Sequence, residues 1–169
     1  LGQLDINEYL EFCLEPLSQN SIETLNKWHQ EFMQSKIIPI ILPKAQVVVD
    51  EHREKGDTLL VITATNRFVT APIVHKYGIE NLLATEPEVK NGRYTGKVKD
   101  EPCFQKGKIN HLNRWLAKTD ESMVGSVFYS DSHNDLPMLE LVDHPVVVNG
   151  DATLQKIASE KGWASLDWT

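Results

Sequence analysis

Apolar residues recur at helical spacing through the first 40 residues of the chain. One predicted helix face collects Ile6, Tyr9, Leu10, Cys13, Leu14 and Leu17, and a second collects Ile22, Leu25, Trp28 and Phe32. This period is that of amphipathic helices. Asn20, followed three residues later by Glu23, predicts a capping pair for the second helix. The stretch IIPIILP, with two prolines, then interrupts the pattern and predicts a connector.

From residue 41 onward, continuous apolar runs alternate with helical patterns. Strands are predicted at TLLVIT (58–63), NLLAT (81–85), MVGSVFYS (123–130) and PVVVN (145–149), and helices at 43–56, 67–78, 106–118, 136–142 and 152–162. The Asn91-Gly92 dipeptide predicts a hairpin within 88–98. Alternation of this kind predicts an α/β fold, with a parallel sheet covered by helices on both faces. We expect this core to occupy 41–169, with 1–40 as a separate helical region.

Composition and charge narrow the classes of protein that fit this pattern. The 169 residues are 41% hydrophobic and 24% charged, so the chain can bury a core. A net charge of −7 argues against a general nucleic-acid binder. We find no apolar run long enough to span a membrane and no secretory signal, and we expect the two cysteines, Cys13 and Cys103, to be reduced. These features predict a cytoplasmic protein without a membrane partner, and they do not indicate its oligomeric state. Because the sequence does not begin with Met, a segment that precedes it is left as an open alternative.

Polar residues gather where the predicted strands end, which is where ligands bind in parallel sheets. Thr63 ends one strand, and two interpretations stay open: its hydroxyl binds a phosphate oxygen, or it caps the following helix. Lys106 and Lys108 begin a helix, where a cation opposes the helix dipole. Either these lysines are solvated or one of them serves an anion site.

The sharpest signal is YSDSHNDLPML, residues 129–139, in which Asp131 directly follows a strand and Asp135 lies near the start of the next helix. Two neighbouring carboxylates repel each other unless a positive group lies between them. Oxygen ligands from one or two carboxylates, completed by water and a substrate phosphate, are the usual arrangement around Mg²⁺. We interpret His133, between the two aspartates, as a solvated turn residue.

The order of these motifs resembles the haloacid dehalogenase superfamily of phosphohydrolases, and within it the phosphoserine-phosphatase-like branch, subfamily IB. The resemblance implies a Rossmann-like core over 41–169 and a helical cap over 1–40. It implies that Thr63 and Ala64 bind the phosphoryl group and that either Lys108 or Lys106 neutralises it, Lys108 being preferred because Leu112 and Leu116 follow at the matching positions. Thr63 and Lys108 would be the catalytic residues.

In the same resemblance, SDSHND matches the family's Gly-Asp-Gly-x-Asn-Asp motif, with serines at 130 and 132 in place of the glycines. It implies that Asp131 and Asp135 hold Mg²⁺ and that Asn134 supports the ligands. The implied activity is Mg²⁺-dependent hydrolysis of a small phosphorylated metabolite through an aspartyl-phosphate intermediate.

The family's nucleophile motif, Asp-x-Asp-x-Thr, does not occur in the sequence. Two explanations stay open. In the first, the nucleophile lies upstream of this chain. In the second, the protein is a truncated or degenerate relative that binds a phosphometabolite or an interaction partner without turnover. The cap also lacks the arginine that clamps a substrate carboxylate in phosphoserine phosphatases, because Cys13 aligns near that position and no arginine precedes Arg53. We expect a neutral or cationic leaving group near Glu8, Glu11 and Glu15.

Overall fold

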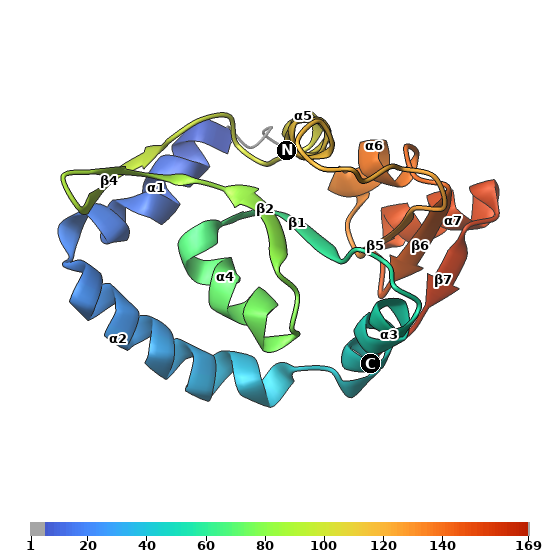
Figure 1. Cartoon of the computed structure of the whole chain (residues 1–169), viewed down its shortest axis with the longest axis horizontal. Coiled ribbons are helices and arrows are strands. Elements are labelled where there is room, and N and C mark those ends of the chain that lie inside the picture. Colours follow the sequence, from blue (N-terminus) through green and yellow to red (C-terminus); the bar gives the residue numbers. More distant parts are fainter. Residues whose placement is uncertain (1–5, 169) are drawn as a thin grey trace. The chain divides into compact units, whose positions relative to one another are not determined.

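The structure, a computed structural model, describes residues 6–168, and these fall into two units (Figure 1). The first unit contains the chain up to Ile41 together with Leu59–Phe104, and the second contains Leu42–Thr58 together with Gln105–Thr169. This division groups residues by contact and does not test the predicted boundary between a cap and a core at residue 40. That boundary stays a prediction.

Two helices open the first unit, as the apolar spacing predicts. They are α1 (Ile6–Gln19) and α2 (Ile22–Phe32). Their buried leucines form a core with side chains from later in the unit; this core contains Leu14, Leu17 and Leu25 with Phe68, Tyr94 and Val98. The predicted Asn20–Glu23 cap is wrong, because the side chain of Ser21 is the one that accepts from the Thr24 N–H.

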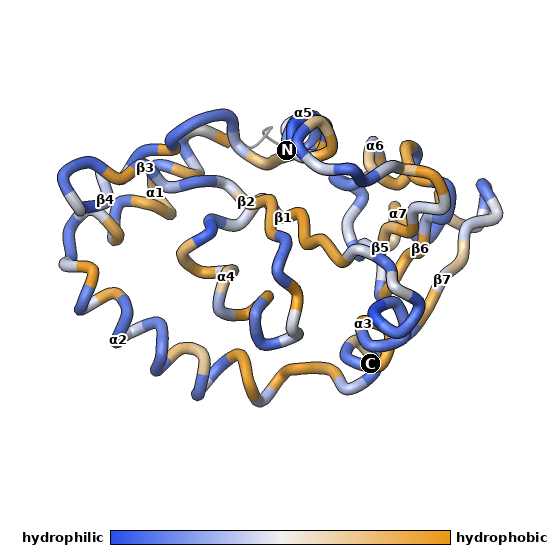
Figure 2. Tube along the Cα trace, in the orientation of Figure 1, coloured by the Kyte–Doolittle hydropathy of each residue, from blue (hydrophilic) through white to orange (hydrophobic). Residues whose placement is uncertain are grey.

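The connector after α2 begins as helix rather than as irregular chain. A π-helical turn (Met33–Ile37) and a 3₁₀ turn (Ile38–Ile40) continue the coil before it ends. Figure 2 shows the last part of this stretch, just before α3, as largely hydrophobic, and Ile40 is 68% exposed. Pro39 removes a backbone donor, which explains why the helix tightens and stops here.

The rest of the first unit is a parallel pair of strands, a helix and a hairpin. Strand β1 (Leu60–Asn66) pairs with β2 (Asn81–Thr85), and α4 (Arg67–Lys76) connects them. Strands β3 (Pro87–Lys90) and β4 (Arg93–Val98) are antiparallel. Asn91 and Gly92 both have positive φ, 51° and 73°, which is the geometry that the predicted two-residue turn requires.

The second unit contains a three-stranded parallel sheet in the order β5-β6-β7. Its elements are α3 (Pro43–Glu54), α5 (Lys106–Leu116), β5 (Val127–Ser130), α6 (Leu136–Leu139), β6 (His144–Val148), α7 (Ala152–Lys161) and β7 (Ala164–Leu166). Its core contains Leu139, Val147, Leu154 and Ala158, with Phe128 and Trp163 packed against it. Strand β7 was not predicted, and β5 is shorter than the apolar run 123–130.

The predicted α/β class with parallel strands is confirmed. The parallel strands form one sheet of two strands in the first unit and one of three in the second. Cys13, which is half-buried, and Cys103, which is buried, are not joined in a disulfide. Among residues 6–168 no single helix is long and apolar enough to cross a membrane; only the bent pair Ile22–Ile40 with Pro43–Glu54 passes by length and composition.

Candidate phosphate and cation site

A hydrogen-bonded cluster forms where β5 ends. Ser130, the last residue of the strand, is buried, and its hydroxyl donates to Asp135 Oδ2 at 2.9 Å. The same Ser130 oxygen accepts from the Ser132 N–H at 3.2 Å. The chain therefore turns sharply after the strand and returns Asp135 to the end of β5. The two serines that replace the expected glycines make specific hydrogen bonds, since Ser132 also accepts from the Asn134 N–H.

Lys108 is the cation of this cluster. It lies in the first turn of α5 with 7% of its surface exposed, and its Nζ lies 2.5 Å from Asp135 Oδ1. A buried ammonium requires a partner of opposite charge, and Asp135 provides it. Lys106, two residues earlier, is exposed. The two lysines that the sequence left as alternatives therefore differ in burial. Their chemical roles stay a prediction.

Asp131 directly follows β5 and is exposed. Its backbone carbonyl accepts from the Asp151 N–H at 2.9 Å, and within residues 6–168 its carboxylate has no hydrogen-bond or ion-pair partner. No group of three or more His, Cys, Asp or Glu side chains able to hold a metal occurs in that range. Mg²⁺ is commonly held by one or two carboxylates with water and phosphate. A free Asp131 carboxylate therefore fits a cation that takes few ligands from the protein.

A second acidic side chain holds the middle of the same loop. Asp151 precedes α7, and its Oδ2 accepts from the backbone N–H of His133 at 2.8 Å and lies 2.9 Å from the His133 ring Nδ1. Its Oδ1 accepts from the Leu154 N–H at 2.9 Å and caps α7. The hydrogen bond from the His133 amide, followed by the one from Leu154, lowers the pKa of Asp151 to about 2. His133 is exposed, as predicted, but it is also paired.

In the first unit, Thr63 and Ala64 lie at an irregularity near the end of β1. Thr63 pairs with Ala84, but the next pair joins Asn66 to Thr85, so the intervening residues bulge from the ladder. The bulge lies within the strand rather than after it, which corrects the predicted strand end. The Thr63 hydroxyl accepts from the Thr65 N–H at 3.2 Å. It is not the cap of α4, since Asn66 accepts from the Val69 N–H in that role.

Thr85, which is fully buried, holds the bulge in place through its hydrogen bonds. Its hydroxyl donates to the Ala64 carbonyl at 2.8 Å and accepts from the Cys103 N–H at 3.1 Å. A buried threonine with both hydrogen-bonding functions satisfied fixes the backbone at the very residues expected to meet a phosphate. The apolar sequence around Thr85 predicts a strand, but gives no indication of this anchor.

The first unit also has a hollow of about 650 Å³, lined by α2, α4 and the strands β3 and β4. Buried His29 lies in its wall, and its Nε2 is 2.9 Å from the Val69 carbonyl oxygen. The acidic residues of the cap helix that the sequence singled out, Glu8, Glu11 and Glu15, are exposed on α1 and do not line this hollow.

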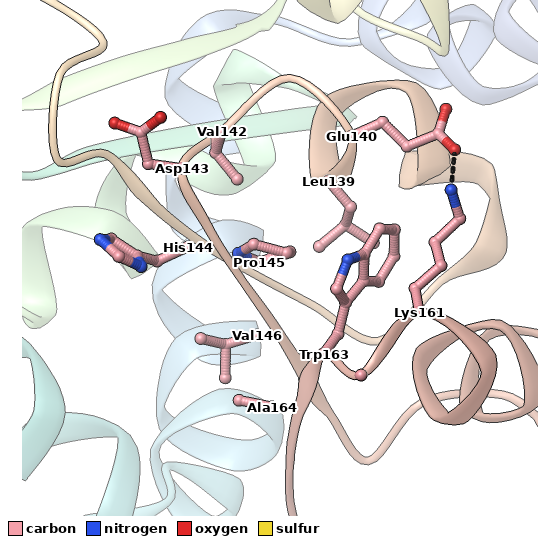
Figure 3. Close-up of a pocket in the computed structure, with 11 residues that line it drawn as sticks. Leu139, Glu140, Val142, Asp143, His144, Pro145, Val146, Lys161, Trp163 and Ala164 are labelled. Atoms are coloured by element: carbon pink, nitrogen blue, oxygen red, sulfur yellow. Dashed lines mark hydrogen bonds and ion pairs between the residues drawn. The ribbon is translucent and has the colours of Figure 1, made fainter.

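A further hollow, of about 560 Å³, lies in the second unit between α6, the C-terminal end of α7 and the starts of two strands (Figure 3). Lys161 lies beside Trp163 and pairs with Glu140 at 2.7 Å. His144 and Ala164 begin β6 and β7, whereas Asp131 follows the end of β5, and all three strands are parallel. This hollow therefore lies at the N-terminal ends of the strands, whereas the Lys108–Asp135 pair lies at their C-terminal ends.

Known proteins resemble this chain over most of its length. The family model described as haloacid dehalogenase-like hydrolase matches residues 1–140. A histidinol-phosphatase of Neisseria meningitidis is 46% identical over 171 residues, covering 99% of this chain and 77% of that protein. A phosphoserine phosphatase of Mycobacterium tuberculosis is 33% identical over 117 residues, which is 69% of this chain and 38% of that protein.

Solved structures share the fold. A protein of unknown function from Bordetella pertussis superposes with a TM-score of 0.96 at 41% identity, covering 99% of this chain and 77% of that one. A probable phosphoserine phosphatase from Vibrio cholerae gives a TM-score of 0.74 at 16% identity, covering 98% of this chain and 48% of that one. The chain thus spans about three quarters of some of these proteins and half or less of others.

Proposed function

Because the chain belongs to the haloacid dehalogenase-like hydrolase family, we propose that it serves Mg²⁺-dependent hydrolysis of a small phosphorylated metabolite. The observation that carries this proposal is the buried Lys108–Asp135 pair beside a free Asp131 carboxylate at the end of β5. Outside an anion site, a lysine in the first turn of a helix is unfavourable, because it opposes the helix dipole. A phosphoryl group bound nearby would explain why a lysine occupies this position.

Each unit has its own task in this proposal. In the first, the Thr63 hydroxyl and the backbone N–H groups of the bulge at Ala64 donate to phosphoryl oxygens. In the second, Lys108 offsets phosphoryl charge, and Asp135, itself held by the Ser130 hydroxyl, keeps the ammonium group in one position before substrate arrives. Preorganised charge of this kind costs no rearrangement at the moment of reaction, which is why it lowers the barrier to phosphoryl transfer.

Asp131 is the residue that would hold Mg²⁺, and Asn134, in the turn that follows, would support the loop. A bound Mg²⁺ supplies neutralisation of the phosphoryl oxygens. Asp135, already paired with Lys108, then acts through the lysine. The aspartyl-phosphate intermediate expected from the resemblance needs a nucleophile in the Asp-x-Asp-x-Thr pattern, and the sequence contains none. In this proposal the residues of this chain bind phosphate and neutralise its charge, and none of them is the attacking group.

For the leaving group we propose an amino alcohol rather than an amino acid. The described part of the cap helix α1 carries exposed glutamates and no arginine, and a carboxylate clamp requires the forked guanidinium. The Neisseria relative is named for histidinol phosphate, which has an amine and no carboxylate. The expected preference is for histidinol phosphate over phosphoserine.

Two measurements test the proposal. The first is calorimetric titration with histidinol phosphate, phosphoserine and inorganic phosphate, each with and without Mg²⁺. The second is an assay of phosphate release from histidinol phosphate and phosphoserine. We expect Mg²⁺-dependent binding that favours histidinol phosphate and that Lys108→Met abolishes, with Lys106→Met as the matched control. Failure of all three compounds to bind in Mg²⁺ would contradict the proposal. Tighter binding of phosphoserine would contradict the leaving-group assignment alone.

A second candidate stays open because the given residues contain no nucleophile motif: a phosphometabolite-binding protein without turnover. The same titrations separate the two functions. Phosphate release that depends on Lys108 and Asp131, assayed on the protein together with any segment that precedes this chain, would favour the hydrolase, whereas Mg²⁺-dependent binding without release by that longer protein would favour the binding protein.

A further inference from the structure

The loop after β5 is attached to a neighbouring turn at two points, and both attachments are made by one residue. The backbone N–H of Asp151 donates to the carbonyl of Asp131, and Asp151 Oδ2 accepts from the backbone N–H of His133. The residues on either side of Ser132 are thus held by the same partner. Because the Asp131 carboxylate itself has no partner within residues 6–168, the backbone sets the direction of its Cα–Cβ bond and no side-chain contact adds to that constraint.

The turn that carries Asp151 is itself fixed. Asn149 adopts a left-handed conformation, with φ of 47°, and its side-chain oxygen accepts from the Trp168 N–H at 2.8 Å. A Cβ built on Gly150 would lie 2.4 Å from a methyl group of Val147, which is fully buried. Any side chain at position 150 would have to displace Val147, so the backbone next to Asp151 is closely packed.

We propose that Asp151 is a positioning residue for the Asp131 carboxylate, holding the loop in the form that binds the cation; this inference rests on the proposed function. Its two carboxylate oxygens have separate tasks. Oδ1 caps α7 through Leu154, as an ordinary helix-capping residue does, whereas Oδ2 holds the loop through His133. A residue that only capped the helix would need the first oxygen alone.

The two tasks can be separated with Asp151→Asn. The asparagine oxygen keeps the cap, but its NH₂ group replaces Oδ2 and faces the His133 N–H donor, so the loop is released. Asp151→Ser is the second variant, because its hydroxyl also caps α7 and cannot reach both partners. Glu160→Gln, on the exposed face of the same helix, is the matched control for loss of one negative charge.

The test is the affinity of the chain for Mn²⁺, measured by electron paramagnetic resonance of the free ion, with thermal unfolding followed in parallel. Changes to residues that orient metal ligands commonly cost about 10–100-fold in affinity. We expect both Asp151 variants to lose roughly tenfold or more, Glu160→Gln to bind like the wild type, and Asp131→Asn to set the lower limit. The loss persists in about 1 M NaCl, where a purely long-range charge effect is screened.

The outcomes distinguish this inference from the function on which it rests. Asp151 variants that bind Mn²⁺ like the wild type, while Asp131→Asn does not, would overturn the positioning role and leave the cation site standing. A loss that disappears in high salt would equally overturn it. Equal Mn²⁺ binding by the wild type and Asp131→Asn would overturn the cation site itself, and the positioning role with it. Amide hydrogen exchange at His133 provides the direct readout, since the Asp151 variants should raise it and Glu160→Gln should not.

Discussion

Replacing Lys108 with methionine removes one partner of a buried ion pair. The side chains of Lys108 and Asp135 are 9% and 12% exposed, and their charged atoms lie 2.5 Å apart. Removal of one member of such a pair costs about 3–5 kcal/mol, because the other charge stays buried without compensation. Asp135 keeps its hydrogen bond from Ser130, so we expect a cost at the lower end, about 3 kcal/mol.

The double variant Lys108→Met with Asp135→Asn removes both charges and keeps an oxygen for Ser130. Exchange of a buried pair for neutral groups is often close to neutral in stability. We therefore expect the double variant to be more stable than Lys108→Met alone, with a coupling energy of about 2 kcal/mol between the two positions. Lys106→Met is the control; this lysine is exposed, and we expect a change within about 0.5 kcal/mol.

The assay is urea unfolding followed by tryptophan fluorescence. Of the four tryptophans, Trp115, Trp163 and Trp168 belong to the second unit and only Trp28 to the first. A Trp28→Phe background therefore reports on the unit that contains the pair. Additivity of the two single changes, within about 0.5 kcal/mol, would refute the reasoning, because it would mean that the two charges do not stabilise each other in the folded state.

Three further predictions concern stability. Thr85→Val removes the donor to the Ala64 carbonyl; we expect a loss of about 1–3 kcal/mol in urea unfolding and weaker phosphate binding. Gly150→Ala forces a methyl group against Val147; we expect about 1–3 kcal/mol of destabilisation, and an unchanged midpoint would contradict the contact. Burial, and then Glu86, raise the pKa of Tyr94. Its unfolded phenol ionises near pH 10, so stability is full below that value and falls as the pH rises toward the folded pKa. Tyr94→Phe should reduce that alkaline loss.

The sequence predicts most helices and strands because their apolar periodicity is strong. The hairpin and β2 have the predicted positions, since Asn91-Gly92 and NLLAT are unambiguous local signals. Strand β7 was not predicted because ASL is short and all three of its residues are exposed, so no alternation of buried and exposed positions marks it. The cap of α2 was assigned one residue early because Asn20 and Ser21 are both good capping residues, and only the backbone geometry selects between them.

The candidate site was predicted less completely than the fold. The loop that contains Asp131 and Asp135 is visible from the sequence, because acidic residues directly follow an apolar strand. The contrast between Lys106 and Lys108 is not, since both lie in the first turn of α5 and only the packing buries one of them. Asp151 is recognisable as a helix cap, but its contact with a loop 18 residues earlier is a tertiary feature.

The ion pair between Lys108 and Asp135 has a consequence for the sequence of events during ligand capture. With the ammonium already matched by a carboxylate, the carboxylates of Asp131 and Asp151 leave this end of β5 negative, and a phosphate dianion is repelled. Phosphate should therefore enter second, after a divalent ion has offset this negative charge. On the proposed function, we therefore expect ordered rather than random addition, with the cation before phosphate, as a consequence of the Lys108–Asp135 contact.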